Sequence, residues 1–378
     1  MKSKRVLSIF GTRPEAIKMA PVVIELQRSE YIDSRVCITA QHREMLDQVL
    51  KIFQITPDID LNLMVPDQSL AEISSAIFSN LDAVLMDIKP DWILVQGDTT
   101  TVMTASILGY YHRIKVGHIE AGLRSGDKWQ PFPEEINRKI ASAVADFHFA
   151  PTEWSRQNLL REGIAENIIQ VTGNPVIDAL HYVASTPVPK EASEIFIQIG
   201  MPKEREESEP RLILVTAHRR ENFGQPLENI CKALLGLAEK YGETVRIVYT
   251  VHLNPNVQEP VYRNLEGLPN ITLLPPLDYQ PLVHLMKRAY IVLTDSGGLQ
   301  EEAPDLGIPV LVMREVTERP EGVEAGTVKV VGTNSEKIIQ ETSLLLDDPT
   351  VYSEMARAVN PYGDGHAAER IVKTLLDV

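Results

Sequence analysis

RVLSIFGTRPEAIKMAPVVIELQRS, residues 5–29, is the stretch that decides the fold class of this chain. A short apolar run of strand-forming residues ends at Gly11, and the residues after it carry apolar side chains at the spacing of an amphipathic helix. Gly11 allows a tight turn between the two elements, and Thr12 with Glu15 matches a capping box at the start of the helix. A strand followed at once by a helix is the repeating unit of parallel α/β sheets.

The same alternation continues through the first half of the chain. After the opening unit the strand-like runs are RVCITA (35–40), DWILVQ (91–96), KVGHIE (115–120) and FHFA (147–150). Amphipathic stretches separate these runs, as expected for helices. We therefore predict a first Rossmann-like domain over residues 1–185, which closes after Asn174.

Residues 186–210 interrupt the pattern with prolines and a dense run of charge, which favours a connecting region. Strand-like runs then resume as RLILVT (211–216), VRIVYTV (245–251), ITLLP (271–275), YIVLT (290–294) and PVLVM (309–313). The second domain is predicted over residues 211–358. The fold class is therefore α/β, with two doubly wound parallel sheets, and we expect a ligand to bind in the interdomain cleft beyond the carboxyl ends of the strands.

Composition excludes several classes of function. The formal net charge of −15 works against nucleic-acid or membrane partners, because both would be repelled at long range. Two cysteines, Cys37 and Cys231, cannot build a disulfide framework or a cysteine-based zinc site. The nine histidines show no HxH or HxxxH spacing, so we predict no metal. The apolar run before Gly11 is too short for a signal segment, and we expect a cytoplasmic protein.

Charged residues gather directly after the predicted strands of the first domain. Arg13 and Lys18 lie near the positive end of the first helix, where they are either surface cations of a well-capped helix or a grip for a diphosphate. Asp98 is either a plain N-cap or a functional carboxylate. Glu120 ends an apolar strand, where a carboxylate is costly unless it is paired or used, and we favour a functional role for it. Structural ion pairing is the alternative for the charges that follow, which include Arg124, Glu134, Glu135 and Arg138.

The second domain carries a different set of candidates. His218 ends a strand and precedes two arginines, which favours contact with an anion over a purely structural role. Ser296, Gly297 and Gly298 open a helix, so backbone N–H groups there can face a phosphate, and Glu301 or Glu302 can accept hydrogen bonds from ribose hydroxyls. The segment matches neither GxGxxG nor a Walker A motif.

Read in order, these segments resemble the non-hydrolysing UDP-N-acetylglucosamine 2-epimerases over nearly the whole chain. The resemblance is carried by GTRPEAIKMAP, QHREMLDQ, QGDTTT, GHIEAGLRSGD, PEEINR, AHRREN, HLNPN, TDSGGLQEEAP, TERPEG and NPYGDGHAAERI. It implies a glycosyltransferase-B-like fold, interconversion of UDP-GlcNAc and UDP-ManNAc without a cofactor, and commonly a homodimer. It also implies that residues 359–378 form a terminal helix that packs back on the first domain.

The resemblance assigns roles residue by residue. The nucleotide contacts that it implies are Arg13, Lys18, Ser296, Gly297, Gly298, Glu302 and Arg319. The catalytic and sugar-side residues that it implies are Asp98, Glu120, Glu134, Arg138 and His218. Family members can also bind a second UDP-GlcNAc as an activator, for which the candidate contacts are Gln41, His42, Arg43, Arg219 and His252. The uracil side is less defined, because Leu277 and Leu282 stand where relatives carry polar or aromatic residues.

The expected reaction is dictated by the weak acidity of the sugar's C2 proton. Departure of UDP from C1 makes this proton labile, so we expect anti elimination to 2-acetamidoglucal and re-addition of UDP with a proton delivered to the opposite face. Closure of the two domains is expected to exclude water. A glycosyltransferase, a hydrolysing epimerase and a non-catalytic nucleotide-sugar sensor remain the alternatives, and a supply of ManNAc-type sugars for surface polysaccharides is what the family suggests.

Overall fold

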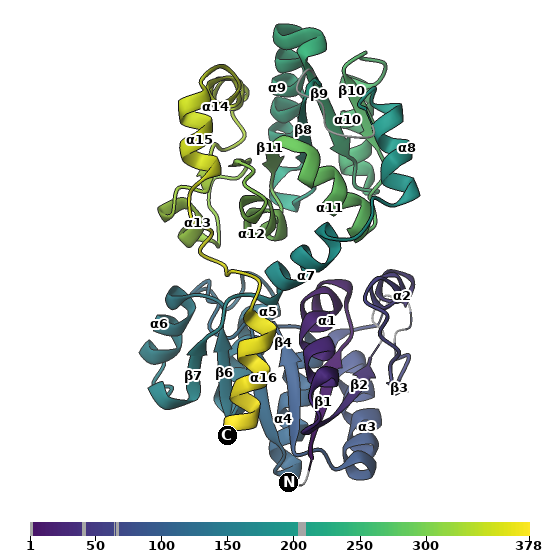
Figure 1. Ribbon diagram of the computed structural model, residues 1–378, viewed down its shortest axis with the longest axis vertical. Helices are drawn as coiled ribbons and strands as arrows, with labels where there is room; N and C mark the ends of the chain where they lie inside the picture. The colour runs from purple at the N-terminus through teal and green to yellow at the C-terminus, as the bar shows by residue number, and fades with distance from the viewer. Residues whose placement is uncertain (1–2, 40–42, 64, 66–67, 203–208) are drawn as a thin grey trace. The chain divides into compact units, whose positions relative to one another are not determined.

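The computed structural model describes residues 3–39, 43–63, 65, 68–202 and 209–378. The chain divides into two compact units, each built on its own sheet (Figure 1). The first comprises Met1–His181 with Tyr362–Val378, and the second comprises Tyr182–Pro361.

The first unit contains a seven-stranded parallel sheet in the order β3-β2-β1-β4-β5-β6-β7. Its strands are β1 (Lys4–Phe10), β2 (Ile32–Ile38), β3 (Ile59–Asp60), β4 (Trp92–Gln96), β5 (Lys115–Ile119), β6 (Phe147–Ala150) and β7 (Ile169–Val171). Strand order reverses between β1 and β4, which is where doubly wound sheets open a crevice at their carboxyl ends.

Helices cover both faces of this sheet. They are α1 (Arg13–Arg28), α2 (Arg43–Ile52), α3 (Leu70–Ile88), α4 (Thr100–His112), α5 (Glu134–Val144), α6 (Glu153–Arg161), the short η1 (Glu166–Ile168), α7 (Pro175–Ala184) and α16 (Ala367–Asp377). The predicted capping box is confirmed, because Thr12 and Glu15 exchange side-chain and backbone hydrogen bonds at the start of α1. The last helix, α16, packs against α1 and lies beside it in Figure 1.

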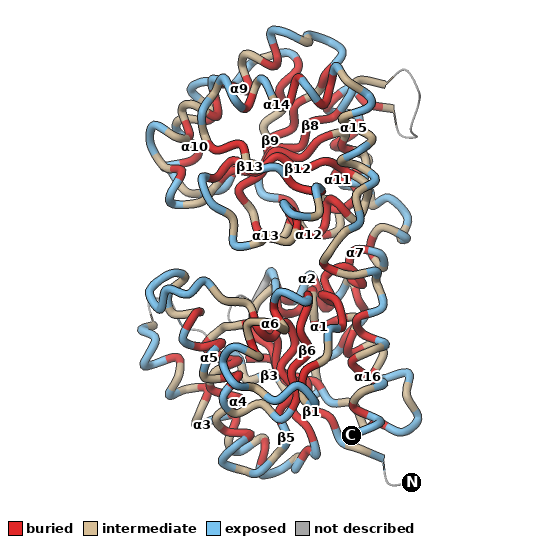
Figure 2. The backbone as a smooth tube through the Cα atoms, turned by 90° about the vertical axis from the view of Figure 1, so that its left-hand side faces the viewer, coloured by how far each residue is buried: buried red, intermediate tan, exposed pale blue. Residues whose placement is uncertain are grey.

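The strand residues of the first unit are buried on both faces, as expected for a parallel sheet between two helical layers. Every residue of β4 is buried, and Figure 2 shows buried backbone along the strands with exposed segments outside them. Close approach of α4 depends on Gly109, because a Cβ atom there would lie 2.7 Å from both Ile93 Cδ1 and Val116 Cγ2.

The second unit is a six-stranded parallel sheet in the order β10-β9-β8-β11-β12-β13. Its strands are β8 (Arg211–Thr216), β9 (Val245–Thr250), β10 (Ile271–Leu274), β11 (Ala289–Thr294), β12 (Val310–Val312) and β13 (Val328–Val330). Its helices are α8 (Lys190–Gln198), η2 (Arg220–Asn222), α9 (Gln225–Tyr241), η3 (Gly242–Thr244), α10 (Pro255–Leu265), α11 (Tyr279–Arg288), α12 (Gly297–Asp305), α13 (Pro320–Glu324), α14 (Ser335–Asp347) and α15 (Pro349–Ala356). The prediction of two doubly wound parallel α/β domains is confirmed.

The region 186–210, interpreted from its composition as a connection, contains helix α8. This helix packs against α11 of the second unit, and Arg246 of β9 donates a hydrogen bond to the carbonyl oxygen of Ile199 at 3.2 Å. The apolar residues Ile195 and Phe196 are buried, so α8 is part of the core packing of the second unit. Composition did not predict this helix, because the prolines and charged residues on both sides of it outnumber the few apolar residues of its buried face.

Candidate active site

Glu120 is a buried carboxylate at the carboxyl end of β5, and polar side chains from three other segments surround it. The Lys18 ammonium lies 2.5 Å from Oε1, and Asn174 Nδ2 donates to the same oxygen at 2.9 Å. Gln96 Nε2 donates to Oε2. The side chain is 6% exposed, so these donors and the positive charge of Lys18 compensate the loss of water around it.

The backbone of Glu120 is strained. Its φ is +61°, in the left-handed region that costs a non-glycine residue about 1 kcal/mol or more. The neighbouring turn at Gly97 lies close by, since a Cβ atom on Gly97 would be 3.5 Å from Glu120 Oε2. His118 Nε2 lies 2.7 Å from the carbonyl oxygen of Gly97 and helps to hold that turn, and burial lowers the pKa of His118 to about 4.

Asp98 follows β4 and is held from the first turns of α5. Arg138 Nη2 lies 2.5 Å from Asp98 Oδ2, and Asn137 Nδ2 donates to the Asp98 carbonyl oxygen at 2.9 Å. Both residues of α5 are buried, so Asp98 has a fixed orientation and a cationic partner. Asp98 and Arg138, both predicted for the sugar side, are thus in direct contact.

Glu134 and Glu135 are neighbours in sequence but have different surroundings. Glu135 is fully buried and accepts hydrogen bonds from the backbone N–H groups of Ser125 and Gly126, at 3.0 Å and 3.2 Å. Glu134 is half-buried, and within the described part of the chain its carboxylate has no hydrogen-bond or ion-pair partner. Glu135 is therefore occupied in holding the loop that precedes α5, and Glu134 is the member of the pair available for chemistry.

Glu15 ties together the two loops at the reversal of strand order. Its Oε2 accepts from the backbone N–H groups of Gly11 and Thr12, at 3.0 Å and 2.7 Å, and its Oε1 accepts from Thr99 Oγ1 at 2.6 Å. Burial raises the pKa of Glu15. The sequence identified Glu15 only as part of a cap, whereas the structure shows that it also joins the start of α1 to the start of α4.

Two predicted cations of α1 have separate positions. Lys18 was expected among the nucleotide contacts, and in the structure its ammonium contacts Glu120. Arg13 is the first residue of the helix and half-buried, and no hydrogen bond or ion pair of its guanidinium is found among the described residues.

In the second unit, His218 lies beside the fully buried Asp295 at the carboxyl end of β11. Asp295 Oδ2 accepts from the backbone N–H groups of His218 and Arg219, both at 2.8 Å, and from Asn222 Nδ2 at 3.0 Å. His218 Nδ1 lies 3.5 Å from Asp295 Oδ1. Burial lowers the pKa of His218, and the carboxylate of Asp295 opposes this effect. The imidazole of His218 stacks on that of His252, with ring centroids 5.4 Å apart.

The loop Ser296–Gly298 opens α12, and Arg319 lies against it. A Cβ atom on Gly297 would be 2.5 Å from Arg319 Nη1, so only glycine admits the guanidinium at this distance. Arg319 Nε lies 2.5 Å from Glu301 Oε1, while Glu302 Oε1 accepts from the Tyr279 hydroxyl at 2.7 Å. The two adjacent glutamates thus differ, since one pairs with a cation and the other with a phenol.

The remaining candidates are less informative. Gln41 and His42 lie outside the described residues, and the side chain of Arg43 is not described either. Arg219 is held through its backbone N–H group. Leu277 is buried and Leu282 half-buried. Among the described residues, no group of three or more histidine, cysteine or acidic side chains is arranged to hold a metal, and no helix is long and apolar enough to cross a membrane.

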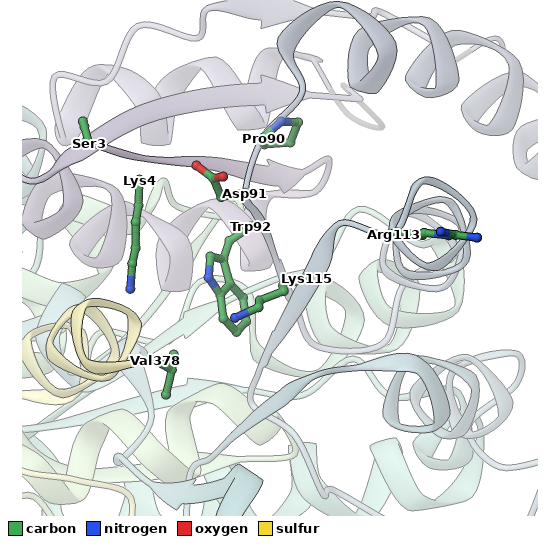
Figure 3. A pocket seen from close by; sticks show the side chains of 8 residues that line it. All are labelled: Ser3, Lys4, Pro90, Asp91, Trp92, Arg113, Lys115 and Val378. Carbon is green, nitrogen blue, oxygen red and sulfur yellow. The ribbon is translucent and has the colours of Figure 1, made fainter. Parts of the chain in front are cut away.

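A pocket of about 390 Å³ lies at the amino ends of strands of the first sheet (Figure 3). Its lining includes Lys4, Trp92 and Lys115, which begin β1, β4 and β5, and the Lys115 ammonium is 5.1 Å from the Trp92 ring centroid. Ligands of parallel sheets bind at the carboxyl ends of strands, where Asp98 and Glu120 lie. The pocket is therefore separate from the candidate active site.

Several residues that hold the site were missed by sequence reasoning. They are Gln96, Asn174, Asn222, Tyr279 and Asp295. Each follows or flanks a strand end, and that position was the only available signal. Asparagine and aspartate near strand ends usually serve turns and caps, and a single glutamine or tyrosine is not distinctive, so nothing local marks these residues as part of a site.

Comparison with known proteins gives a consistent result. The family model described as UDP-N-acetylglucosamine 2-epimerase matches residues 24–376. The UDP-N-acetylglucosamine 2-epimerase of Yersinia pestis is 56% identical over 371 residues, covering 98% of each chain, and that of Escherichia coli K12 is 52% identical with the same coverage.

Solved structures are similar over the full length as well. The Neisseria meningitidis UDP-GlcNAc 2-epimerase bound to UDP-GlcNAc has a TM-score of 0.90 and 51% identity, covering 99% of this chain and 100% of that one. The Methanocaldococcus jannaschii enzyme in complex with UDP-GlcNAc and UDP has a TM-score of 0.80 and 32% identity, with the same coverage.

Proposed function

This chain belongs to the UDP-N-acetylglucosamine 2-epimerase family, and we propose that it interconverts UDP-GlcNAc and UDP-ManNAc by eliminating and re-adding UDP. The epimerase activity follows from family membership at 52–56% identity over the full chain. We further propose the elimination route and the roles of individual residues.

The chemistry of C2 determines the order of events. The C2 proton has no adjacent carbonyl group, so a carboxylate cannot remove it directly at a useful rate. In the proposed first half-reaction, the C1–O bond breaks with its electron pair leaving on UDP, a carboxylate takes the C2 proton, and the C1–C2 double bond of 2-acetamidoglucal forms. In the second half, UDP re-adds to C1 and a proton is delivered to the opposite face of C2. Atoms and electrons balance without a redox cofactor.

The observation that carries this proposal is the environment of Glu120. A carboxylate that only stabilised the fold would not need a strained backbone and donors from three separate segments, Lys18, Gln96 and Asn174. Its position at a strand's carboxyl end is where substrates of such sheets bind. We assign Glu120 to proton transfer at C2.

Two more carboxylates can serve the other face of the ring. Asp98 is oriented by Arg138 of α5, and Glu134 is the half-buried first residue of the same helix. Removing the C2 proton from one face of the ring and delivering a proton to the other face requires at least two acid/base groups. We therefore include Asp98 and Glu134 in the catalytic set and assign neither of them to a face.

The second unit supplies groups suited to the leaving UDP. We propose that the N–H groups of Gly297 and Gly298 and the guanidinium of Arg319 contact the diphosphate, with Arg13 as a further cation, and that Glu302 accepts from the ribose. His218, positioned by Asp295, assists at the diphosphate as charge develops on it. We also propose that the two units close around the substrate and thereby exclude water.

Wider roles are also part of the proposal. We propose a cytoplasmic homodimer, activated by a second UDP-GlcNAc, that supplies ManNAc-type sugars for surface polysaccharides. Light scattering of the purified protein tests the dimer, since a mass equal to one 42.3 kDa chain would exclude it.

The deciding experiment is proton NMR of UDP-GlcNAc with the protein in D₂O. Formation of UDP-ManNAc with deuterium at C2 is the expected result, because the eliminated proton exchanges with solvent before re-addition. Free ManNAc and UDP would instead indicate a hydrolysing reaction. Unchanged substrate would exclude the proposal and favour a sensor or a transferase.

A further inference from the structure

Asn174 connects Glu120 to the place where the chain passes between its two units. Its side-chain Nδ2 donates to Glu120 Oε1 at 2.9 Å, and its Oδ1 accepts from the backbone N–H of Val176 at 3.2 Å, at the start of α7. Its own backbone N–H donates to the carbonyl oxygen of Tyr362 at 2.7 Å. Asn174 is 1% exposed, so its contacts leave little room for another orientation.

Tyr362 is where the chain returns to the first unit after Pro361, and the outgoing chain leaves that unit through α7 after His181. The outgoing and returning segments touch through glycines. A Cβ atom on Gly173 would lie 3.2 Å from Gly363 Cα, and one on Gly365 would lie 2.2 Å from His181 Nδ1. Gly173, Gly363 and Gly365 all have positive φ, so side chains are excluded by both conformation and space.

Polar contacts fasten the same two segments, residues 172–181 and 362–370, which we call the crossing junction. The Asp178 carboxylate accepts from the backbone N–H groups of Ala367 and Ala368, at 3.2 Å and 2.8 Å. Arg370 Nη1 donates to the carbonyl oxygen of Thr172 at 3.0 Å. Helix α16 then packs against α1, which carries Lys18, the other partner of Glu120 Oε1.

We propose that the crossing junction positions Glu120. In this proposal, Asn174 couples the course of the outgoing and returning chain segments to the orientation of the catalytic carboxylate. Lys18 and Asn174, which donate to Glu120 Oε1, belong to segments that the returning chain holds in place. A change in the course of either crossing, such as that caused by substrate-driven movement of the second unit, alters the orientation of Glu120. This inference rests on the proposed function and adds a control of proton transfer to it.

The first test replaces Asn174 by aspartate. Asn174→Asp keeps the shape, the acceptor for Val176 and the backbone N–H to Tyr362, and it replaces the donor to Glu120 by a carboxyl oxygen, which places a second negative charge beside Glu120. We expect kcat for epimerisation to fall about 100-fold, as for a catalytic group displaced by a fraction of a bond length. The dissociation constant of UDP, measured by calorimetry, should stay within about 2-fold because Asn174 is not among its proposed contacts, most of which are in the second unit. The acid limb of the kcat–pH profile should move to higher pH, since a carboxylate without its donor binds protons more readily.

The second test disturbs the junction without touching the Asn174 side chain. Gly363→Ala places a Cβ atom 3.3 Å from Gly173 Cα and 3.4 Å from Asn174 N. Arg370→Gln removes the hydrogen bond to Thr172 together with the ion pair between Arg370 and Asp364, both of which lie within the junction. We expect kcat to fall roughly 10-fold and 3-fold respectively, with the same displacement of the acid limb and unchanged UDP binding. Thr374→Val, which removes a hydroxyl contact of α16 to Gln170 outside the junction, should leave kcat and the profile unaltered.

The outcomes separate the two proposals. If Gly363→Ala and Arg370→Gln lose thermal stability but keep the wild-type kcat and acid limb, the junction is structural only and the inference fails. Failure of the unmodified protein to form UDP-ManNAc would instead overturn the proposed function.

Discussion

Two buried carboxylates, Glu120 in the first unit and Asp295 in the second, follow central strands of similar sheets and are held in different ways. Asp295 is fully buried, and two of its three donors are backbone N–H groups of a loop, His218 and Arg219. Glu120 is 6% exposed and held by side chains from distant segments. A carboxylate bound by backbone N–H groups organises a loop, much as a cap organises a helix end. A carboxylate held by side chains has a controlled orientation, and one of its oxygens can still contact a ligand.

The two units also differ in the functional groups that they present. The first unit presents three acids, of which Asp98 pairs with Arg138 and Glu120 pairs with Lys18, while Glu134 has no such partner among the described residues. The second presents a glycine-opened helix, an arginine and a histidine, which suit an anion. In the proposed mechanism, proton transfer and leaving-group stabilisation therefore rest on separate sheets, and changes in one unit should affect one property more than the other.

The largest expected effect is on turnover, from Glu120→Gln. The amide keeps the shape but cannot accept a proton and places an N–H group among existing donors, so we expect kcat to fall about 1,000-fold. UDP affinity, measured by calorimetry, should remain close to that of the wild type. Retention of more than a tenth of wild-type turnover would remove Glu120 from the catalytic set.

Asp295→Ala should act mainly on stability. The substitution leaves buried N–H donors of His218, Arg219 and Asn222 without an acceptor, which we expect to lower the free energy of unfolding of the second unit by about 3 kcal/mol. Urea denaturation followed by circular dichroism measures this. In protein that remains folded, kcat should fall less than in Glu120→Gln, and a larger fall would show that Asp295 takes part in the reaction itself.

Acid should destabilise the first unit through two buried histidines. Burial lowers the pKa of His118 to about 4 and of His148 to about 3, below the ordinary value of 6.5. Between these values the unfolded chain binds protons that the folded chain does not, so stability is fully present above pH 6.5 and is lost as the pH falls towards 4. The loss should approach about 3 kcal/mol for each histidine.

His148→Phe provides the check on that expectation. Within the described residues neither ring nitrogen of His148 has a hydrogen-bond partner, so an aromatic ring without nitrogens should fit at little cost. Thermal melts between pH 7 and pH 4.5 should show roughly half the acid-induced loss of the wild type. An unaltered pH dependence would mean that other groups control acid sensitivity.

The smallest expected effect is on nucleotide affinity, from Gly297→Ala. The added Cβ atom would meet Arg319 Nη1 at 2.5 Å and displace the guanidinium, so we expect UDP to bind roughly 10-fold more weakly. Gly298→Ala, whose Cβ atom would meet Glu302 Oε2 at 3.6 Å, should weaken binding less. Equal losses for the two variants would show that Arg319 is not the reason for the glycine.

Some of the candidate site could be predicted from sequence because its signals are local. An acid after an apolar strand, as at Glu120, and glycines before a helix, as at Gly297, are visible within a few residues. The difference between Glu134 and Glu135 was not visible, since it depends on which side of α5 faces the loop at Ser125. The contact between Lys18 and Glu120 was not visible either, because it joins residues 102 positions apart, and the assignment of Lys18 to the nucleotide stays a prediction.

What the sequence alone determined is the series of strands and helices, the capping box of Thr12 and Glu15, and from these the two parallel sheets, because hydrophobic periodicity and capping act between residues a few positions apart. Only the tertiary structure decided which polar side chains meet. Lys18, Gln96 and Asn174 converge on Glu120 because the start of α1, the end of β4 and the loop before α7 all lie at the carboxyl ends of the strands of one sheet. No local pattern encodes that convergence, since the donors are far apart in sequence.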